Sequence, residues 1–558
     1  MDAQLIPLNV QDETILQQLE QEDPLLANQC HYIWKYGNYP VYDTTAVKFY
    51  PEAYLGYEEQ LKELEKAKHF IFLEYHAIEE AEAFARLKDV LARKAAEGVE
   101  VRILYDDVGC IGFLDKSFID RMNAIGVQCR VFNYVVPFLN IFMNNRDHRK
   151  IMVIDGKVGF TGGYNLADEY FNITHPYGYW KDTGVKLTGR AVQNFTMMFL
   201  EMWNVMGQAD TDYEKYLKAS QEGAEDGNVQ KASGYVQPYA DSPLDGEPVG
   251  ENVYLNLIKT AKKRLYVATP YLIISDEMTR ELGLAAKRGV DVRVFTPGIP
   301  DKKIIYGVTR SYYSGLVRQG VRVYEYTPGF LHAKQMLCDG DTATVGTINM
   351  DYRSLYHHFE NGVWMHGCDA IRDIEADFDK LLQDSEEVTD KYRDGRKNMA
   401  GGGGGGRYCN RHNNGKLEIT MKILVSACLL GENCKYNGKN NYSERVAKYL
   451  EGHEVIPVCP EVLGGLPTPR DPSEIVSGEV INCKGVNVDR QFREGAEEAL
   501  RIAKENGIDL AILQSRSPSC GVKQIYDGSF TGKIIPGQGV FAQLLEKNGF
   551  RVMDCEEI

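Results

Sequence analysis

The sequence has little of what a membrane-spanning or secreted chain needs. Its 558 residues contain no run of 18 or more apolar residues, whereas a helix that spans a bilayer needs about 20. The two longest apolar stretches, Val131–Met143 and Phe195–Met206, are interrupted by asparagine or glutamate. The first residues lack a basic segment followed by an apolar one, so no signal peptide is indicated. These absences predict a soluble intracellular chain.

Positive charge is also scarce, with 63 Lys and Arg against 79 Asp and Glu and a net charge of −16. Binding to nucleic acid without sequence preference needs clustered positive charge, so no nucleic-acid partner is expected. Hydrophobic residues make up 44% and aromatic residues 11% of the chain, which is enough to build cores and excludes global disorder. At roughly 150 residues per domain, the length predicts three or four domains.

A boundary divides the chain near residue 400. Six glycines, Gly401–Gly406, cannot hold a helix or a packed strand, because glycine loses the most backbone entropy on ordering. Residues 396–420 are therefore interpreted as a linker, and Met421 begins a new strand-like segment. Our hypothesis is that residues 401–420 are translated intergenic sequence joining two formerly separate genes. Six of the 12 cysteines follow residue 420, and such a concentration of thiols indicates metal, cluster or redox chemistry.

The part before the linker contains an internal repeat. Gly98-Val-Glu-Val-Arg102 matches Gly289-Val-Asp-Val-Arg293, and the segments that start at Ala67 and Ala261 also match. Each copy is predicted to form a strand, an amphipathic helix and a second strand, which implies parallel sheets covered by helices. We expect an N-terminal segment at 1–45, one α/β repeat at 46–215, a second at 216–395, and a separate small α/β domain at 421–558.

Each repeat ends in the same polar pattern, H-x-K-x4-D. The six residues concerned are His148, Lys150, Asp155, His332, Lys334 and Asp339. An asparagine follows each copy, at Asn165 and Asn349. Residues i and i+2 of a strand share one face, so the His and the Lys of each copy point to the same side. Two such strands that meet at a pseudo-two-fold axis would gather two imidazoles, two ammonium groups and two amides.

This set suits chemistry on a phosphodiester. One neutral imidazole can attack phosphorus to give a phosphohistidine, while the other protonates the leaving alkoxide and later deprotonates the incoming hydroxyl. The lysines and asparagines would hold the phosphate oxygens. The attacking nitrogen must be unprotonated, so the other ring nitrogen needs an acceptor. Asp182 and Glu360, which follow the two motifs, are the candidate histidine-orienting acceptors.

The duplicated pattern resembles the phospholipase D superfamily, and its surroundings resemble bacterial cardiolipin synthases over about residues 20–395. The resemblance rests on segments such as Asn145-Arg-Asp-His148-Arg-Lys150 and Tyr324-Glu-Tyr-Thr-Pro-Gly-Phe-Leu-His332-Ala-Lys334. It implies duplicated α/β sandwich units around one catalytic region. It also implies transfer of a phosphatidyl group between two phosphatidylglycerols, giving cardiolipin and glycerol without a cofactor. By the family pattern His148 is the nucleophile and His332 the acid and base, but the roles could be swapped.

The resemblance leaves several points open. Such synthases usually carry N-terminal transmembrane helices, so either the start is truncated or the protein binds the cytoplasmic side of an anionic membrane peripherally. Residues 131–143 could dip into the bilayer or form a buried strand and loop. A phosphodiesterase that hydrolyses phospholipids, a nuclease of the same superfamily and a catalytically inactive lipid-binding scaffold are the alternatives. The acidic charge disfavours the nuclease, and the complete motifs disfavour the scaffold.

The cysteine-rich part places three thiols just past the ends of three predicted parallel strands, at Cys428, Cys459 and Cys520. Ligand sites of open α/β sheets lie in that crevice. The cysteines do not show the paired Cys-x2-Cys spacing of a zinc ribbon. Three thiolates with room for a non-protein ligand fit an iron–sulfur cluster with one open iron. Structural thiols are the alternative.

This domain resembles the thiouracil desulfurase family over nearly all its length. The segments that carry the resemblance are Ser426-Ala-Cys428-Leu-Leu-Gly, Pro457-Val-Cys459-Pro-Glu461 and Ser517-Pro-Ser-Cys520-Gly. It implies a [4Fe-4S] cluster on Cys428, Cys459 and Cys520 that takes sulfur from a thiolated nucleobase, with Glu461 and Ser517 as candidates for proton transfer and substrate contact. Cys434 could replace one ligand or act as an extra thiol, and Cys483 and Cys555 are interpreted as structural. A cluster-bearing sensor without turnover is the alternative.

Overall fold

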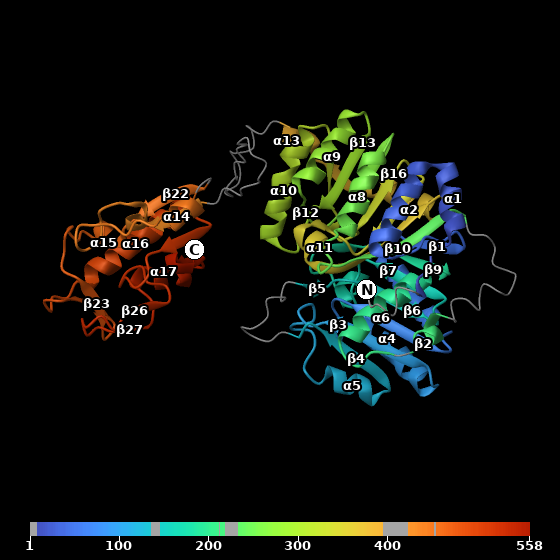
Figure 1. The fold of residues 1–558 in the computed structure, drawn as a ribbon, viewed down its shortest axis with the longest axis horizontal. Helices are drawn as coiled ribbons and strands as arrows, with labels where there is room; N and C mark the ends of the chain where they lie inside the picture. The colour runs from blue at the N-terminus through green and yellow to red at the C-terminus, as the bar shows by residue number, and fades with distance from the viewer. Residues whose placement is uncertain are drawn as a thin grey trace. The chain divides into compact units, whose positions relative to one another are not determined.

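The computed structural model describes residues 8–134, 145–210, 212–217, 233–393, 422–450 and 453–557. It divides into two compact units, Met1–Gly401 and Gly402–Ile558, which are treated separately below (Figure 1). The linker expected at 396–420 lies outside the described residues, as does most of the candidate membrane loop at 131–143. Among the helices of the described parts, none is both long and apolar enough to cross a membrane.

The first unit contains two large sheets of the same strand order. The first runs β1-β9-β7-β6-β2-β3-β4. The second runs β10-β19-β17-β16-β11-β13-β14, with β20 added at its edge. The strands of the first are β1 (Thr45–Tyr50), β2 (Phe70–Tyr75), β3 (Glu100–Asp106), β4 (Val127–Phe132), β6 (Lys150–Ile154), β7 (Val158–Gly162) and β9 (Gly184–Gly189). Those of the second are β10 (Tyr235–Asp241), β11 (Arg264–Ala268), β13 (Asp291–Pro297), β14 (Arg322–Tyr326), β16 (Gln335–Cys338), β17 (Thr342–Gly346), β19 (His358–His366) and β20 (Ser385–Glu387).

The matching strand orders confirm a duplicated α/β unit, but the sheets are mixed rather than parallel as expected. In the first sheet β2, β3 and β4 are parallel, whereas β6 is antiparallel to both β2 and β7. The second sheet repeats this, with β16 antiparallel to β11 and β17. The reason is the short turn after each motif strand, because three residues can reverse a chain but cannot make the crossover that a parallel neighbour needs.

Helices cover both sheets. They are α1 (Glu13–Glu22), α2 (Pro24–Gly37), α3 (Ala53–Leu64), α4 (Glu82–Ala96), α5 (Phe118–Ala124), α6 (Val192–Val205), α8 (Val249–Thr260), α9 (Asp276–Lys287), α10 (Lys303–Val317), α11 (Tyr352–Tyr356), α12 (Ala370–Gln383) and α13 (Thr389–Arg393). Helices α6 and α12 each contact strands of both sheets, and the hydrophobic core around them is shared by the two repeats. A second core lies within the first repeat. The N-terminal helix α2 packs on α8 and β10, so the segment expected at 1–45 belongs structurally with the second repeat.

Two short parallel pairings also join the repeats. Strand β5 (Arg146–Asp147) of the first repeat pairs with β19 of the second, and β15 (Gly329–Leu331) of the second pairs with β8 (Tyr179–Lys181) of the first. A third short pair, β12 (Leu272–Ile273) with β18 (Met350–Asp351), lies within the second repeat. The first two pairings lead directly into the two histidine motifs.

The second unit is built on a parallel four-stranded sheet of order β22-β21-β25-β28. Its strands are β21 (Lys422–Ser426), β22 (Glu454–Val458), β25 (Leu510–Leu513) and β28 (Val552–Asp554). Two hairpins, β23 (Ser473–Val476) with β24 (Glu479–Asn482) and β26 (Gln524–Tyr526) with β27 (Ile534–Pro536), extend from it. The helices are α14 (Glu444–Tyr449), α15 (Pro460–Leu463), α16 (Asp489–Asn506) and α17 (Val540–Lys547). This agrees with the small α/β domain that the sequence predicts.

Candidate active sites

The two cross-repeat pairings place each motif histidine beside a carboxylate of the other repeat. In the register of β5 with β19, Asp147 lies opposite Phe359, so the next position pairs His148 with Glu360. Nδ1 of His148 lies 2.9 Å from Oε2 of Glu360. In the register of β15 with β8, the next position pairs His332 with Asp182, and their Nδ1 and Oδ2 atoms are 2.6 Å apart. The candidate acceptors are thus in contact with the histidines, but each serves the motif of the opposite repeat.

The carboxylate contacts favour the same tautomer of both imidazoles. An ionised carboxylate can only accept, so Nδ1 of each histidine carries the proton and Nε2 keeps its lone pair. Glu360 is held in turn by the hydroxyl of Thr347, which donates to Oε2 at 2.5 Å. Asp182 is held by the backbone amide of Thr183, which donates to Oδ1 at 2.9 Å. Gly163 lies where a Cβ would come within 2.1 Å of Asp182, so glycine is required there for the carboxylate to fit.

The two motif lysines are buried beside the histidines. Nζ of Lys150 donates to the backbone carbonyl of His148 at 2.6 Å. Nζ of Lys334 donates to the carbonyl of His332 and lies 2.8 Å from its Nδ1. Burial lowers the pKa of Lys150 to about 8 and that of Lys334 to about 7. Burial thus disfavours the charged form of both amines, while little water surrounds them to screen the charge that they carry.

The histidines themselves are kept neutral. Burial, and then the neighbouring Lys334, lower the pKa of His332 to about 4, although Asp182 acts in the opposite direction. Burial and then Lys150 lower the pKa of His148 well below its ordinary value. Lys334 and His332 also lower the pKa of His148, so the two motifs lie near enough to interact electrostatically. A neutral imidazole with a free Nε2 is the form that can attack an electrophile or take up a proton.

The motif aspartates do not belong to this site, which corrects their assignment as catalytic. Asp155 follows the far end of β6, and its carboxylate accepts the backbone amides of Lys68, His69 and Phe70 at 2.7–2.8 Å. Asp339 follows β16 and accepts the equivalent amides of residues 262–264 at 2.7–3.0 Å. Both have positive φ angles, 51° and 53°, which aspartate tolerates better than most residues. Each aspartate thus links the end of its motif strand to the start of the neighbouring strand, β2 for Asp155 and β11 for Asp339.

The two asparagines differ in their contacts. Asn165 accepts the backbone amide of Ala77 at 3.2 Å and donates to the hydroxyl of Tyr170 at 2.8 Å. The ring of Tyr170 lies edge-on to His332, with centroids 5.4 Å apart. Oδ1 of Asn349 is buried, and among the described residues it has no hydrogen-bond partner. Asn165 is therefore engaged in positioning the pocket wall, and Asn349 keeps an unpaired amide oxygen.

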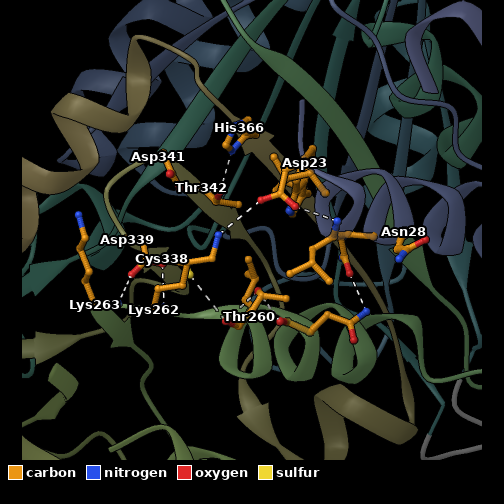
Figure 2. Close-up of a pocket in the computed structure, with 16 residues that line it drawn as sticks. Asp23, Asn28, Thr260, Lys262, Lys263, Cys338, Asp339, Asp341, Thr342 and His366 are labelled. Carbon is orange, nitrogen blue, oxygen red and sulfur yellow. Dashed lines mark hydrogen bonds and ion pairs between the residues drawn. The ribbon is translucent and has the colours of Figure 1, made fainter. Parts of the chain in front are cut away.

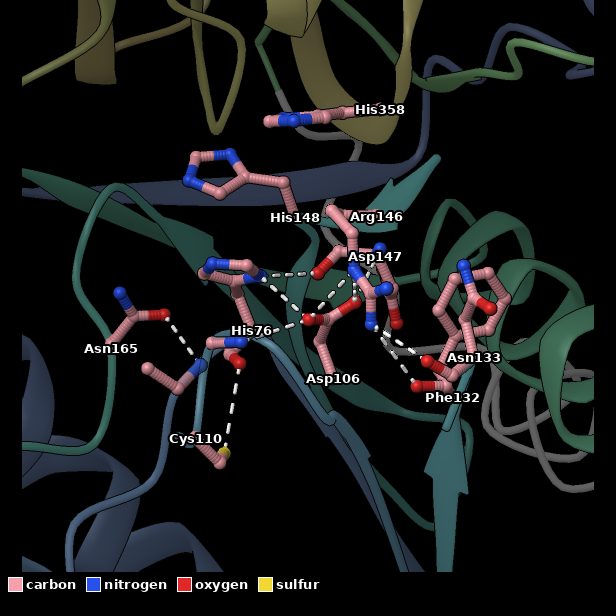
Figure 3. A network of polar contacts seen from close by, with 12 residues as sticks. His76, Asp106, Cys110, Phe132, Asn133, Arg146, Asp147, His148, Asn165 and His358 are labelled. Carbon is pink, nitrogen blue, oxygen red and sulfur yellow. Dashed lines mark hydrogen bonds and ion pairs between the residues drawn. The ribbon is translucent and has the colours of Figure 1, made fainter. Parts of the chain in front are cut away.

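Figure 3 shows side chains around His148 that sequence reasoning missed. His76 follows β2, and its Nδ1 lies 2.8 Å from the carbonyl oxygen of Asp147, while its ring stands edge-on to His148 at 4.9 Å. The ring of His358 lies 5.5 Å from that of His148 on the other side. His358 could have been found from the sequence, because it belongs to the pair His357-His358 and stands two residues before Glu360. No pattern there pointed to His76.

A buried ion-pair network holds the strand that presents His148. Nε of Arg146 donates to Asp106 at 2.9 Å, and the backbone amide of Asp147 donates to the same carboxylate at 3.0 Å (Figure 3). On the other side of His148, Nε of the fully buried Arg149 lies 2.7 Å from Glu74. Burial raises the pKa of Asp106 to about 6, against the effect of Arg146. Paired charges at this depth are costly to separate, so β5 is held firmly.

A separate cavity of about 300 Å³ lies at the opposite end of the second motif strand (Figure 2). Asp339, Lys262 and His366 line it, together with residues of α2 and α8. The motif histidines and lysines do not line it. Because Asp339 and His332 stand at opposite ends of β16, this cavity is not part of the histidine site.

In the second unit, the predicted cysteines line one cavity of about 580 Å³. Cys428 follows β21, Cys459 follows β22, and Cys520 follows β25 after a loop. Cys434 lines the same cavity, and its thiol contacts those of Cys428 and Cys459. A hydrogen bond with Cys434, together with burial, raises the pKa of Cys459. Burial raises the pKa of Cys520 to about 12. Such thiols become thiolates when a cation shares the site.

Glu461 and Ser517 lie together beside the thiols. The hydroxyl of Ser517 donates to Oε1 of Glu461 at 3.3 Å, and Nε of Arg470 donates to Oε2 at 2.9 Å. The hydroxyl of Ser517 also accepts the backbone amide of Cys520 at 3.1 Å. Cys483 lines the cavity too, whereas Cys555 does not. A soft set of thiols with a carboxylate and a hydroxyl at its rim fits a cluster that binds a polar ligand.

Comparison with known proteins gives two separate family matches. Residues 61–203 and 254–382 match the model "Cardiolipin synthase, PLD-like domain", and residues 423–557 match "2-thiouracil desulfurase". An uncharacterized protein of Streptococcus mutans is 45% identical over 68% of this chain and 80% of its own length. A cardiolipin synthase of Alkalihalophilus pseudofirmus is 36% identical over 63% of this chain and 69% of its own length. For cardiolipin synthase 2 of Bacillus cereus, which is 39% identical, the chain spans 63% of the relative's length.

Among solved structures, a [4Fe-4S]-dependent thiouracil desulfidase matches the C-terminal part with 40% sequence identity. The match covers 25% of this chain and 93% of that protein, with a TM-score of 0.24. The sequence matches therefore fall on the two units that the structure separates, and on each they agree with the resemblance drawn from the motifs.

Proposed function

The chain belongs to the cardiolipin synthase family of phosphatidyltransferases and carries a C-terminal domain of the 2-thiouracil desulfurase family, and from this premise we propose a function for each unit. The first unit transfers a phosphatidyl group from one phosphatidylglycerol to another, giving cardiolipin and glycerol. The observation that supports it best is the crossed pairing of His148 with Glu360 and of His332 with Asp182. This pairing leaves two neutral Nε2 atoms beside two lysines, which suits a double displacement at phosphorus.

In the first step, Nε2 of His148 attacks phosphorus, and the bond from phosphorus to the glycerol oxygen breaks. His332 supplies the proton that the departing glycerol oxygen needs. A bound phosphodiester brings negative charge that favours the protonated forms of His332 and Lys334. Glu360 stabilises the positive charge that develops on His148. Lys150 and Lys334 hold the phosphate oxygens, as Asn349 does with its amide.

In the second step, His332 takes the proton from the hydroxyl of the second phosphatidylglycerol. The hydroxyl oxygen attacks phosphorus, and the bond from phosphorus to Nε2 of His148 breaks. Both imidazoles return to their starting state, so no cofactor is consumed. The phospholipid substrate further implies peripheral contact with an anionic membrane surface on its cytoplasmic side.

The test is lipid mass spectrometry after the full chain is incubated with phosphatidylglycerol vesicles. Cardiolipin and glycerol are expected from the wild type and not from His148→Ala or His332→Ala. His357→Ala, which removes the exposed histidine next to the site, is the matched control and is expected to keep the activity. Phosphatidic acid in place of cardiolipin would make water the acceptor and the protein a hydrolase. Absence of any lipid product would refute the proposal.

For the second unit, we propose removal of sulfur from a thiolated nucleobase. Cys428, Cys459 and Cys520 would hold a [4Fe-4S] cluster, which when bound supplies an iron able to coordinate sulfur. Glu461 would hold or release a proton at Oε1, since Ser517 donates to that atom while Arg470 occupies Oε2. Release of sulfide from 2-thiouracil by anaerobically reconstituted protein, with Cys459→Ala as the inactive control, tests this proposal. Equal release by both proteins would refute it.

A further inference from the structure

Both ring nitrogens of His358, which lies beside His148, are buried and have no hydrogen-bond partner among the residues that the structure describes. Next to them lies Glu360, whose two carboxylate oxygens share the proton on Nδ1 of His148, each at 2.9 Å from that nitrogen. The side chain of Glu360 is fully buried, and that of His358 is 12% exposed. Buried polar atoms are nearly always paired, because an unpaired one costs about 1–3 kcal/mol. An imidazole with both nitrogens unpaired beside a buried carboxylate points to a ligand with positive charge.

The spacing of these groups suits a metal ion. Nδ1 of His148 lies 2.9 Å from Oε1 of Glu360, and Nδ1 of His358 lies 3.6 Å from the same oxygen. One ligand atom from each of the three residues lies within 4.8 Å of the others. Around a tetrahedral Zn²⁺, with bonds of about 2.0–2.2 Å, neighbouring ligand atoms stand roughly 3.3–3.5 Å apart. Side-chain shifts of about an ångström would complete such a site.

We propose that His148, His358 and Glu360 bind a first-row divalent transition-metal ion, Zn²⁺ in the first place, and that the ion inhibits phosphatidyl transfer. Two imidazoles and a carboxylate are ligands that this class of ion favours, and three protein ligands leave a fourth position for water. Mg²⁺ and Ca²⁺ prefer oxygen ligands, so the site discriminates against them. The charges of Lys150 and Lys334 oppose any cation here, whereas Glu360 and Asp182 favour it.

The ion would inhibit the transfer because it changes the tautomer of His148. The ion takes the lone pair of Nδ1 of His148, so the proton that Nδ1 donated to Glu360 moves to Nε2. No proton is gained or lost by the ring, but the nitrogen that attacks phosphorus no longer has a lone pair. Oε2 of Glu360 can keep the hydrogen bond from Thr347 while Oε1 binds the ion. The metal site and the nucleophile are therefore mutually exclusive uses of one histidine.

Binding is tested on the full chain with Cys428, Cys434, Cys459 and Cys520 all changed to Ser, because those thiols would bind the same ions. Titration with Co²⁺ is expected to give one equivalent of a visible ligand-field spectrum without thiolate charge-transfer bands. His358→Gln should weaken Co²⁺ binding by about tenfold or more, since loss even of groups that only support a metal ligand costs about 10–100-fold. His357→Gln changes the adjacent exposed histidine and should leave the binding as it was. His358→Asn serves as a second variant in case the first does not fold.

A crystal of the unsubstituted protein soaked in Zn²⁺ should show an anomalous peak between His148, His358 and Glu360. No peak there, or Co²⁺ binding that His358→Gln does not weaken, would overturn the proposal and leave His358 as a simple donor to Glu360. The inhibitory part rests on the proposed transferase activity. Zn²⁺ should inhibit cardiolipin formation, a chelator should restore it, and His358→Gln should be inhibited less relative to its own rate without Zn²⁺. Because binding is read spectroscopically, failure of the transferase assay would not be mistaken for failure of the metal site.

Discussion

Replacement of Asp182 by Asn tests whether the crossed carboxylates set the chemistry. Oδ1 of Asp182 accepts the backbone amide of Thr183 at 2.9 Å, and Oδ2 lies 2.6 Å from Nδ1 of His332. An asparagine has one oxygen for these two donors. If its oxygen stays with Thr183, its NH₂ faces Nδ1, and His332 must carry its proton on Nε2. If the amide turns around, the buried amide of Thr183 loses its acceptor.

Either arrangement is costly. The lost hydrogen bond to a charged group is worth about 1.5–3 kcal/mol, and the donor left without an acceptor costs about 1–3 kcal/mol. Together they amount to about 2.5–6 kcal/mol, or roughly two to four decades of rate at about 1.4 kcal/mol per decade. This range reaches the loss of about 10⁴-fold known when the aspartate of a serine-protease triad becomes asparagine. We therefore expect kcat for cardiolipin formation to fall by about 10²–10⁴-fold.

The assay is a single turnover on phosphatidylglycerol vesicles, quenched in alkali and followed by mass spectrometry of the intact protein. With His332 as the base of the second step, Asp182→Asn should accumulate the phosphatidyl-enzyme, because Nε2 can no longer take the proton of the acceptor. Glu360→Gln should instead slow its formation. An exchange of these two results would swap the roles of the histidines.

The control removes a buried aspartate of the same repeat that lies away from the chemistry. Asp168 accepts the amides of Glu82 and Ala83 at the start of α4, where the N-cap residue Ala81 has no side-chain acceptor. Asp168→Asn should lower thermal stability without a comparable loss of kcat. If Asp182→Asn keeps kcat within about tenfold of the wild type, the orienting role derived from the geometry is refuted.

Three further predictions concern charge, the motif aspartates and the thiols. Burial lowers the pKa of Lys334 to about 7, so Lys334 loses its charge near neutrality and kcat/KM should fall as pH rises above 7. On the acid side, kcat/KM should fall only where Nε2 of His148 becomes protonated, and burial holds the pKa of His148 well below its ordinary value. Asparagine tolerates the positive φ of Asp155 but is a weaker acceptor for the three backbone amides. Asp155→Asn should therefore lower the free energy of unfolding by about 1–3 kcal/mol in chemical denaturation, while kcat stays within about threefold of the wild type. A larger loss of kcat would show that Asp155 is catalytic. Anaerobically reconstituted wild-type protein and the control variant Cys483→Ala should both absorb broadly in the visible, whereas Cys459→Ala should lack this absorption. Equal spectra for all three proteins would contradict the assignment of Cys459 as a cluster ligand.

The sequence was informative where function depends on a pattern along the chain. The duplicated H-x-K-x4-D motif indicated the first family and the segments around Cys428, Cys459 and Cys520 indicated the second, and the family matches confirm both. The alternation of strands and helices in each repeat predicted the α/β class, and the acidic residues that follow the two motifs, Asp182 and Glu360, were the candidate acceptors. The motif gives the number of residues between His148 and Asp155 but does not show that a strand, β6, lies between them. The sequence therefore did not indicate that Asp155 lies at the end of β6 away from His148.

What the sequence could not show arises from pairings between distant strands. Strand direction in the sheets is set by the short turn after each motif strand, and α/β alternation alone predicts the parallel arrangement. His76 lies 72 residues before His148 in the sequence, and no periodicity connects them. Which acid serves which histidine depends on the register of β5 with β19 and of β15 with β8. Two-residue and three-residue strands leave no propensity signal from which that register could be derived.

The crossed register has a consequence for the two repeats as a unit. A repeat folded alone would present His148 without Glu360, or His332 without Asp182, and either imidazole would be free to adopt the inactive tautomer. It would also expose the apolar surface that α6 and α12 bury against both sheets. Activity and stability therefore depend on the same contacts, and a half that carries a complete H-x-K-x4-D motif should still be inactive. Completeness of the site is therefore a property of the paired repeats and not of either motif alone.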